Sequence, residues 1–331
     1  MTGCSGDKSP AQSSHRSAAS PSSTAITGPA EVSHSKLPGI QSLKKARAVQ
    51  INETPNIDWT LVAYGKAWVK GVGKGIGIFD AKTGHPLGSV RVEQGPCAAM
   101  DAAFGSIWTA TCFTPGVARI DARTGRLTGF TKTADFDSES TIGAGEKGVW
   151  IVTNGKRCMG CLVVRIDPKT MKISNRFHVP DRATAVRAGA GGVWVTYNSN
   201  DTVLHLDPRT GAVVATIPVG EGPRFFDVGD GGVWVMGQSD GSLCHINASD
   251  DSLVGCSVID RNGVAGGDLT VGDGYVWFRG SAELVTQIDA RTGKVVRRIG
   301  RPEGSGSASA GSGELWITAH DVAHIYRVPE H

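Results

Sequence analysis

The sequence predicts an all-β fold, a seven-bladed β-propeller in which each blade has four short antiparallel strands. Three observations predict it. The 331 residues include 45 Gly, about twice the usual share. Tryptophan recurs at a nearly constant interval, and a Gly-containing hairpin motif follows most of these tryptophans. No apolar run is long enough to span a membrane as a helix, and no long apolar stripe has helical spacing.

Residues 1–42 form a separate segment. Ten Ser and four Pro occur before position 41, and large apolar residues are almost absent. Such a segment cannot bury enough surface to offset the entropy lost on ordering. We therefore expect a disordered tether over residues 1–42 and a propeller over residues 43–331.

The first four residues, Met1-Thr2-Gly3-Cys4, resemble the end of a bacterial lipobox, in which the Cys is lipidated after cleavage. The charged and hydrophobic parts of a signal peptide are missing, so either the sequence starts at the lipobox or its start codon was assigned inside the true signal. The alternative is an incidental Cys in an unfolded terminus. We predict lipidation of Cys4, with the membrane contacted only through that lipid.

Seven tryptophans define the internal repeat, at intervals of 39 to 44 residues: Trp68, Trp108, Trp150, Trp194, Trp234, Trp277 and Trp316. We expect them to pack between neighbouring blades. A second marker follows most of them, as in Leu-Asp-Pro-Arg-Thr-Gly at 206–211 and Ile-Asp-Ala-Arg-Thr-Gly at 288–293. Its Asp accepts backbone N–H bonds and its Gly takes a left-handed conformation, which predicts a tight turn between two strands. In the fifth unit the four strands are expected at 224–228, 233–236, 243–246 and 253–259.

The two ends of the repeat indicate how the ring closes. The last unit stops after its third strand, at 325–328, while an orphan strand at 47–51 precedes the first unit. The N-terminal strand should complete the last blade and leave no unpaired edge there. Deletion of residues 1–41 should then leave stability unchanged, and deletion of residues 1–52 should be severe.

From Leu43 onward the chain resembles the seven-bladed propellers of the YVTN-repeat and streptogramin lyase-like families. The resemblance rests on Gly-Val-Trp-Val at 192–195, the Asp-Pro-Arg-Thr-Gly marker and Ile-Pro-Val-Gly-Glu-Gly-Pro at 217–223. It implies a fold that hosts enzymes and pure binding modules alike. The lyases use a His with nearby acidic residues and a divalent metal, and the nine His of this chain do not reproduce that set. His320 is the one catalytic candidate, and Mg²⁺ is expected only if the protein is a lyase.

Six cysteines fall into three local pairs: Cys97 with Cys112, Cys158 with Cys161, and Cys244 with Cys256. In each pair the partners are neighbours across a predicted hairpin or turn and can reach the Cα separation that a disulfide prefers. We expect three structural disulfides and an oxidising, extracytoplasmic compartment. The Cys-x-x-Cys pair has a redox role or half of a metal site as its alternative, although the second pair of ligands is missing. No metal or other cofactor is otherwise expected.

A candidate ligand site follows from alignment on the repeat tryptophans. Large or charged residues at the predicted mouth of the ring gather on blades five, six and one: Asp58, Trp59, Arg224, Phe225, Asp268 and Arg279. Trp59 is the only tryptophan outside the repeat position. Such a set can bind a small polar or aromatic ligand by stacking and charge-assisted hydrogen bonds. The alternative is an ordinary wet channel with internal ion pairs.

Charge excludes one class of partner. Lys and Arg total 34 against 31 for Asp and Glu, and the formal charge of +3 is too small and dispersed for nucleic acid. We expect a monomeric, extracytoplasmic module, a cell-surface or periplasmic lipoprotein, that binds a small molecule or a cell-envelope protein without chemistry. The alternative is a metal-dependent C–O lyase of the streptogramin type.

Overall fold

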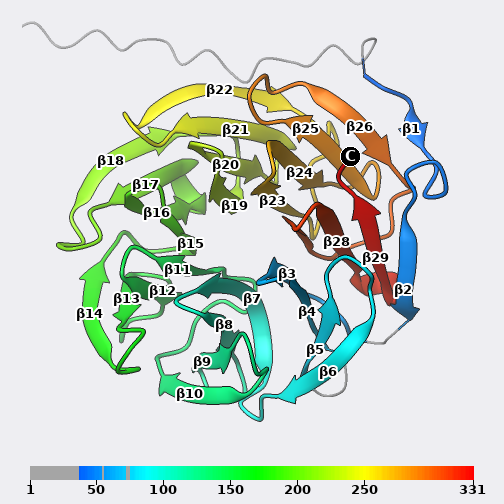
Figure 1. Ribbon diagram of the computed structural model, residues 1–331. Helices are drawn as coiled ribbons and strands as arrows, with labels where there is room; N and C mark the ends of the chain where they lie inside the picture. Colours follow the sequence, from blue (N-terminus) through cyan, green and yellow to red (C-terminus); the bar gives the residue numbers. More distant parts are fainter. Residues whose placement is uncertain (1–36, 54–55, 72–74) are drawn as a thin grey trace, which may run out of the picture.

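The computed structural model describes residues 37–53, 56–71 and 75–331, and it confirms the predicted seven-bladed propeller (Figure 1). Seven four-stranded antiparallel sheets surround a central axis, one of them extended by a short parallel strand, and the innermost strands are β3, β7, β11, β15, β19, β23 and β27. Within the described ranges the only helical elements are two short 3₁₀ turns, Asn198–Asn200 and His320–Val322, so none of them could cross a membrane. The predicted lipidation site Cys4 and the predicted tether up to residue 36 lie outside the described residues.

Each blade runs from the axis to the perimeter in chain order, except that the outer strand of blade seven comes from the N-terminal segment. Blade one comprises β3 (Thr60–Ala63), β4 (Lys66–Lys70), β5 (Gly75–Asp80) and β6 (Pro86–Arg91). Blade two comprises β7 (Pro96–Ala103), β8 (Ser106–Thr111), β9 (Gly116–Asp121) and β10 (Leu127–Lys132). Blade three comprises β11 (Ile142–Gly145), β12 (Gly148–Thr153), β13 (Leu162–Ile166) and β14 (Ile173–His178). Blades four and five comprise β15 (Ala183–Gly189), β16 (Gly192–Tyr197), β17 (Thr202–Leu206) and β18 (Val213–Pro218); and β19 (Pro223–Gly229), β20 (Gly232–Gly237), β21 (Ser242–Asn247) and β22 (Ser252–Val258). Blade six comprises β23 (Asp268–Gly272), β24 (Tyr275–Arg279), β25 (Val285–Asp289) and β26 (Val295–Ile299), and blade seven comprises β27 (Ala308–Gly311), β28 (Glu314–Ala319), β29 (His324–Pro329) and β2 (Val49–Glu53).

The ring closes through the N-terminal segment, as predicted. β2 pairs antiparallel with β29, with Val49 opposite Arg327, and so supplies the outer strand of blade seven. The strand begins two residues later than the predicted 47–51, because Arg47 has a left-handed φ of 57° and belongs to the preceding turn. Closure therefore joins the two ends of the described chain within one sheet.

A second N-terminal strand was not anticipated. β1 (Ile40–Gln41) pairs in parallel with β26, which gives blade six a fifth strand. Gly300 donates its backbone N–H to the Gln41 carbonyl at 2.9 Å. Paired strand structure thus begins at Ile40, before the predicted boundary at residue 43, and a deletion of residues 1–41 removes this short strand.

The repeat tryptophans are buried, and they pack between one blade and the next. In four of them the indole N–H donates to a carbonyl five residues earlier, as from Trp194 to Gly189 at 3.1 Å. His205 stacks on Trp194 at 4.1 Å and His245 on Trp234 at 3.9 Å, while Arg165 occupies the same place over Trp150. These histidines are framework residues.

The hairpin marker behaves as its sequence predicts. Asp207 accepts hydrogen bonds from the backbone N–H groups of Arg209 and Thr210 and from the Thr210 hydroxyl, at 2.7 to 2.9 Å. Bonds from the Thr three residues on lower the pKa of this carboxyl and of its four equivalents, Asp80, Asp121, Asp167 and Asp289. Each turn is therefore held by its own side chain.

All three predicted disulfides are present. Cys244 and Cys256 are direct partners across β21 and β22, with Cα atoms 4.0 Å apart. Cys97 with Cys112 and Cys158 with Cys161 each have a Cα separation of 5.8 Å. Three disulfides indicate an oxidising, extracytoplasmic environment.

Replacing Cys97 and Cys112 together with Ser should lower the free energy of unfolding by about 2 to 3 kcal/mol, because the bond constrains the unfolded chain. The Cys158/Cys161 pair should contribute less, since it closes the shorter loop. Denaturant titration of the two double variants measures this, and mass mapping of unreduced protein should recover the three pairings. Free thiols at these six positions in protein from the cell envelope would contradict the assignment.

Candidate binding site at the mouth of the central channel

The central channel is lined by residues that join each blade to the next. Asp101 of β7 accepts the backbone N–H of Ala144 in blade three at 2.7 Å. Asp227 of β19 accepts that of Val271 in blade six at 2.9 Å. The Ser309 hydroxyl of β27 accepts the backbone N–H of Val62 in blade one at 2.8 Å. These side chains lie seven residues before their repeat tryptophan, and they cross-link adjacent inner strands.

Arg187 is the cation within this channel, in a cavity of about 210 Å³. Its guanidinium donates to the Ile142 carbonyl at 2.7 Å and lies 3.7 Å from Asp227. Burial raises the pKa of Asp101 to about 6 and that of Asp268 to about 6, and it also raises the pKa of Asp227. The Arg187–Asp227 ion pair thus lies inside the channel.

The channel carboxylates predict a pH-dependent stability. Folding raises the pKa of Asp101 from 3.8 to about 6, so the protonated carboxyl is favoured in the folded state. Its contribution to the free energy of unfolding is therefore complete below pH 3.8 and is lost as the pH rises through about 6. Asp101→Asn should therefore lose less unfolding free energy than the native chain between pH 4 and pH 7. Denaturant titration across that range tests this, with the exposed Asp135→Asn as control. Parallel pH profiles for the native and Asp101→Asn proteins would contradict it.

Two of the six predicted ligand residues belong to this framework. Asp268 accepts hydrogen bonds from the Ser307 hydroxyl at 2.8 Å and the Ala308 N–H at 3.2 Å. The Arg279 side chain is fully buried. Its guanidinium donates to four backbone carbonyls at 2.9 to 3.3 Å, those of Thr318, Leu284, Gly304 and Ser305. Both residues tie blade six to blade seven.

Three other predicted residues meet in a cavity of about 330 Å³ where the first strands begin, which we call the mouth cavity. Its lining consists of Asp58, Trp59, Glu139, Phe225, Gly266, Gly267, Ser305, Gly306, Ser307 and His320. Trp59 and Phe225 form its apolar floor, with ring centroids 5.8 Å apart in an edge-to-face arrangement. Trp59 borders the channel cavity as well, so it separates the two.

The polar groups of the mouth cavity are unevenly paired. Asp58 forms an ion pair with Lys70 at 2.5 Å, and the same ammonium donates to the Cys97 carbonyl at 2.9 Å. Glu139, on the loop between β10 and β11, has no ion pair with the described residues. Partial burial and then repulsion from Asp58 raise the pKa of Glu139. Glu139 lies on a connecting loop outside the repeat alignment, so no repeat position in the sequence marks it as a candidate.

A second cavity, of about 480 Å³, adjoins the first, and we call it the side groove. It is lined by residues of blades three to five, among them Phe136, Met159 and Arg182. The loop at 133–141 and the start of β19 contribute to both cavities. Arg224 lines the side groove and not the mouth cavity, and it forms an ion pair with Asp137 at 2.7 Å. Its guanidinium lies 5.9 Å from the centre of the Phe225 ring, at the border of the two cavities.

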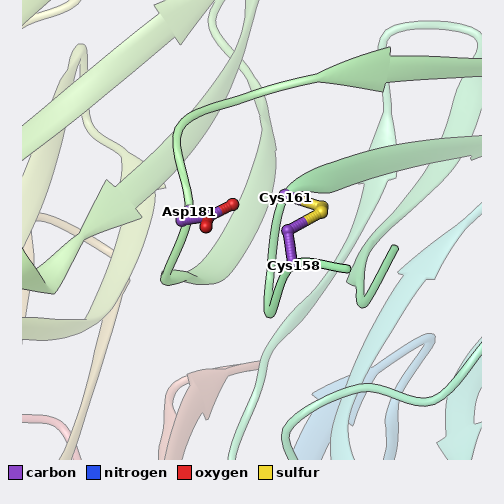
Figure 2. Close-up of side chains that lie close together, drawn as sticks. All are labelled: Cys158, Cys161 and Asp181. Carbon is purple, nitrogen blue, oxygen red and sulfur yellow. A yellow bond between two sulfur atoms is a disulfide. The ribbon is translucent and has the colours of Figure 1, made fainter. Parts of the chain in front are cut away.

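His320, the catalytic candidate, lies on the rim of the mouth cavity. Its ring nitrogen is 3.0 Å from Asp321, and both side chains are about half exposed. Among the described residues the one group with metal-ligand spacing is Cys158, Cys161 and Asp181, and there the two sulfurs form a disulfide (Figure 2). The described residues around His320 thus do not assemble the donor set that the lyase alternative requires.

Comparison with known proteins supports the fold alone. No family model matches the chain, and no curated protein matches its sequence. A solved structure of U3-55K has a TM-score of 0.70 at 8% identity, covering 85% of this chain and 98% of the other. BamB from Moraxella catarrhalis has a TM-score of 0.55 at 13% identity over 84% of each chain. The Pan2 WD40 domain from Neurospora crassa has a TM-score of 0.65 at 13% identity, covering 84% of this chain and 89% of the other.

These similarities are below the level at which function transfers, and propellers carry many unrelated functions. The resemblance to YVTN-repeat and streptogramin lyase-like propellers finds no match among family models or curated sequences. What the comparisons establish is that the chain is a β-propeller.

Proposed function

We propose that the protein is an extracytoplasmic, non-catalytic binding module that takes a segment of a partner protein in the side groove. The observation that carries the proposal is the pair of adjoining cavities at one end of the channel, whose rims hold groups that the framework does not use. Met159 is 70% exposed, and Arg182 makes no ion pair with any described residue. An apolar wall beside an unpaired guanidinium suits an extended peptide that carries an apolar side chain and a carboxylate.

The groove is also built on rigid supports. Met159 lies within the loop closed by Cys158 and Cys161, and its carbonyl accepts the backbone N–H of Arg182 at 2.7 Å. The disulfide loop of blade three is therefore fixed to the segment that leads into blade four. A preformed site of this kind loses little entropy on binding.

A photo-crosslinking residue placed at Met159 should capture one envelope protein that mass spectrometry can identify. The same residue at Val254, a perimeter position that is 62% exposed, should not capture it. Arg182→Glu should reduce the Met159 crosslink at least about fivefold, because it reverses the charge that faces the partner. Quantitative mass spectrometry of crosslinked cells measures both. Equal capture at the two positions, or no effect of Arg182→Glu, would contradict the proposal.

Lipidation of Cys4 would place this module at the cell surface or in the periplasm, and it stays a proposal of ours. The C–O lyase alternative depends on His320 alone. Incubation with a depsipeptide antibiotic and Mg²⁺ tests it: turnover that His320→Ala abolishes would favour the lyase, and absence of turnover would count against it.

A further inference from the structure

One of the three disulfides does not join separate strands. The disulfides of blades two and five each connect two neighbouring strands of their blade. Cys158 and Cys161 are instead three positions apart within the loop 154–161, which connects β12 to β13. A bond that closes so short a loop removes little entropy from the unfolded chain. A contribution to stability therefore does not account for this disulfide.

The loop that carries this disulfide is also held by backbone hydrogen bonds. Gly155 donates its N–H to the Cys158 carbonyl at 2.9 Å, and Val179, after β14, donates to the Cys161 carbonyl at 3.0 Å. These bonds do not depend on the S–S bond, so they can keep the two sulfurs close together after reduction. The disulfide can therefore open and close again without unfolding of blade three.

The two sulfurs differ in their exposure. Cys158 is half-buried, whereas Cys161 is only 2% exposed, so an incoming thiolate reaches the Cys158 sulfur first. Asp181, on the exposed connection between β14 and β15, faces the disulfide with a carboxylate oxygen within 4.8 Å of both sulfurs (Figure 2). Within the described ranges, neither of the other two disulfides has a carboxylate or an imidazole as close to both of its sulfurs.

We propose that Cys158–Cys161 is a thiol–disulfide exchange site that oxidises cysteines of a partner protein. A partner thiolate attacks Cys158 Sγ, the S–S bond breaks, and Cys161 leaves as a thiolate that takes up a proton. A second partner thiolate then attacks the partner sulfur of the mixed disulfide and releases Cys158. The partner gains one disulfide, and two electrons and two protons pass to Cys158 and Cys161. Reverse exchange with another disulfide of the oxidising compartment restores the site.

Asp181 is placed to carry the proton of the first step. A carboxylate at this distance can accept the proton of the incoming thiol through one water and pass it to the Cys161 sulfur. The inference rests on the proposed function, because the side groove would hold the partner. Met159, between the two cysteines, lines that groove. The substrate is thus a partner segment that carries cysteines beside the apolar side chain and the carboxylate that the groove accepts.

Glutathione tests the chemistry without a partner. Brief treatment, acid quenching and mass mapping should find glutathione on Cys158 and a free thiol at Cys161. This opening should be at least about tenfold faster than that of Cys244–Cys256, where Cys244 is fully buried. In Cys161→Ser, Cys158 should form a mixed disulfide with oxidised glutathione. Cys158→Ser is the matched control, because the thiol of buried Cys161 should stay unmodified. Melting temperatures of the variants verify folding.

The pH dependence of opening tests the role of Asp181. Asp181→Asn should slow opening by glutathione about fivefold or more at about pH 6, and should leave it unchanged at about pH 9.5, where the thiol is already ionised. Loss of the charge alone would speed attack by an anionic thiolate, so the two effects have opposite signs. Glu93→Gln, an exposed carboxylate elsewhere, should change neither rate. A rate at pH 6 that is unchanged or faster in Asp181→Asn would overturn the proton transfer.

Equal opening of Cys158–Cys161 and Cys244–Cys256, or glutathione found on Cys161, would overturn the exchange site. In cells, Cys161→Ser should retain a mixed disulfide with the same protein that the Met159 crosslink identifies, and a different protein there would refute the substrate assignment. If glutathione leaves Cys158–Cys161 closed while the crosslink persists, the exchange site is refuted and the proposed function stands. If glutathione opens it selectively and the crosslink fails, the side groove is refuted instead.

Discussion

Removal of residues 1–53 is expected to lower the melting temperature by more than about 10 °C or to prevent folding, whereas removal of residues 1–36 should change it by less than about 2 °C. The longer deletion removes β2, the outer strand of blade seven, and leaves β29 as an open edge. It also removes Ala46, which is buried against blades six and seven, and Ile51, which packs against the cluster around Trp316. Blade seven also contacts blade one, as where the Trp316 indole donates to the Ala81 carbonyl, but among the described strands β2 alone pairs with blade seven from the N-terminal side.

A third deletion, of residues 1–42, separates closure from the extra strand. It removes β1 and its parallel pairing with β26 but retains β2. We expect a small loss, since β1 has only two residues in the sheet. Differential scanning calorimetry of the three truncations provides the measurement. If the 1–53 deletion melts within a degree or two of the 1–36 deletion, closure by β2 does not stabilise the ring.

Features that repeat along the chain were predictable from the sequence. The tryptophan interval and the Asp-containing turn recur in blade after blade, so each copy supports the assignment of the others. The cysteine pairs were predictable for a related reason: Cys244 and Cys256 are neighbours across a hairpin, and hairpin register follows from the turn. Blade number, disulfide pairing and the closing strand all follow from such local rules.

Contacts between blades were less predictable. On a strand, every second side chain points toward the same face. The candidate site was sought nine residues before each repeat tryptophan, whereas the charged residues Asp101, Arg187 and Asp227 lie seven residues before it. These three positions carried a usable signal that was missed. No local rule indicates the ion pair of Arg224 with Asp137, which joins residues 87 positions apart. It is this contact that places Arg224 in the side groove. Glu139 on its loop was missed for the same reason.

Arg279→Met is expected to destabilise the protein by about 3 to 5 kcal/mol, the cost of breaking a buried, hydrogen-bonded charge network. The substitution leaves four backbone carbonyls without their donor, two of them buried and two partly buried, and it removes one positive charge near Asp268. Burial lowers the pKa of Arg279 to about 10, so the guanidinium is still charged near neutral pH. Denaturant unfolding at pH 7 measures the loss.

Two further variants decide whether this loss reflects the framework role. Arg279→Lys keeps the charge but lacks the planar fork that reaches carbonyls of both blades, so it should recover only part of the stability. Arg224→Met removes a guanidinium whose ion pair with Asp137 is partly exposed, and it should cost about 1 kcal/mol or less. A loss from Arg279→Met as small as that from Arg224→Met would mean that the four carbonyls are satisfied by water.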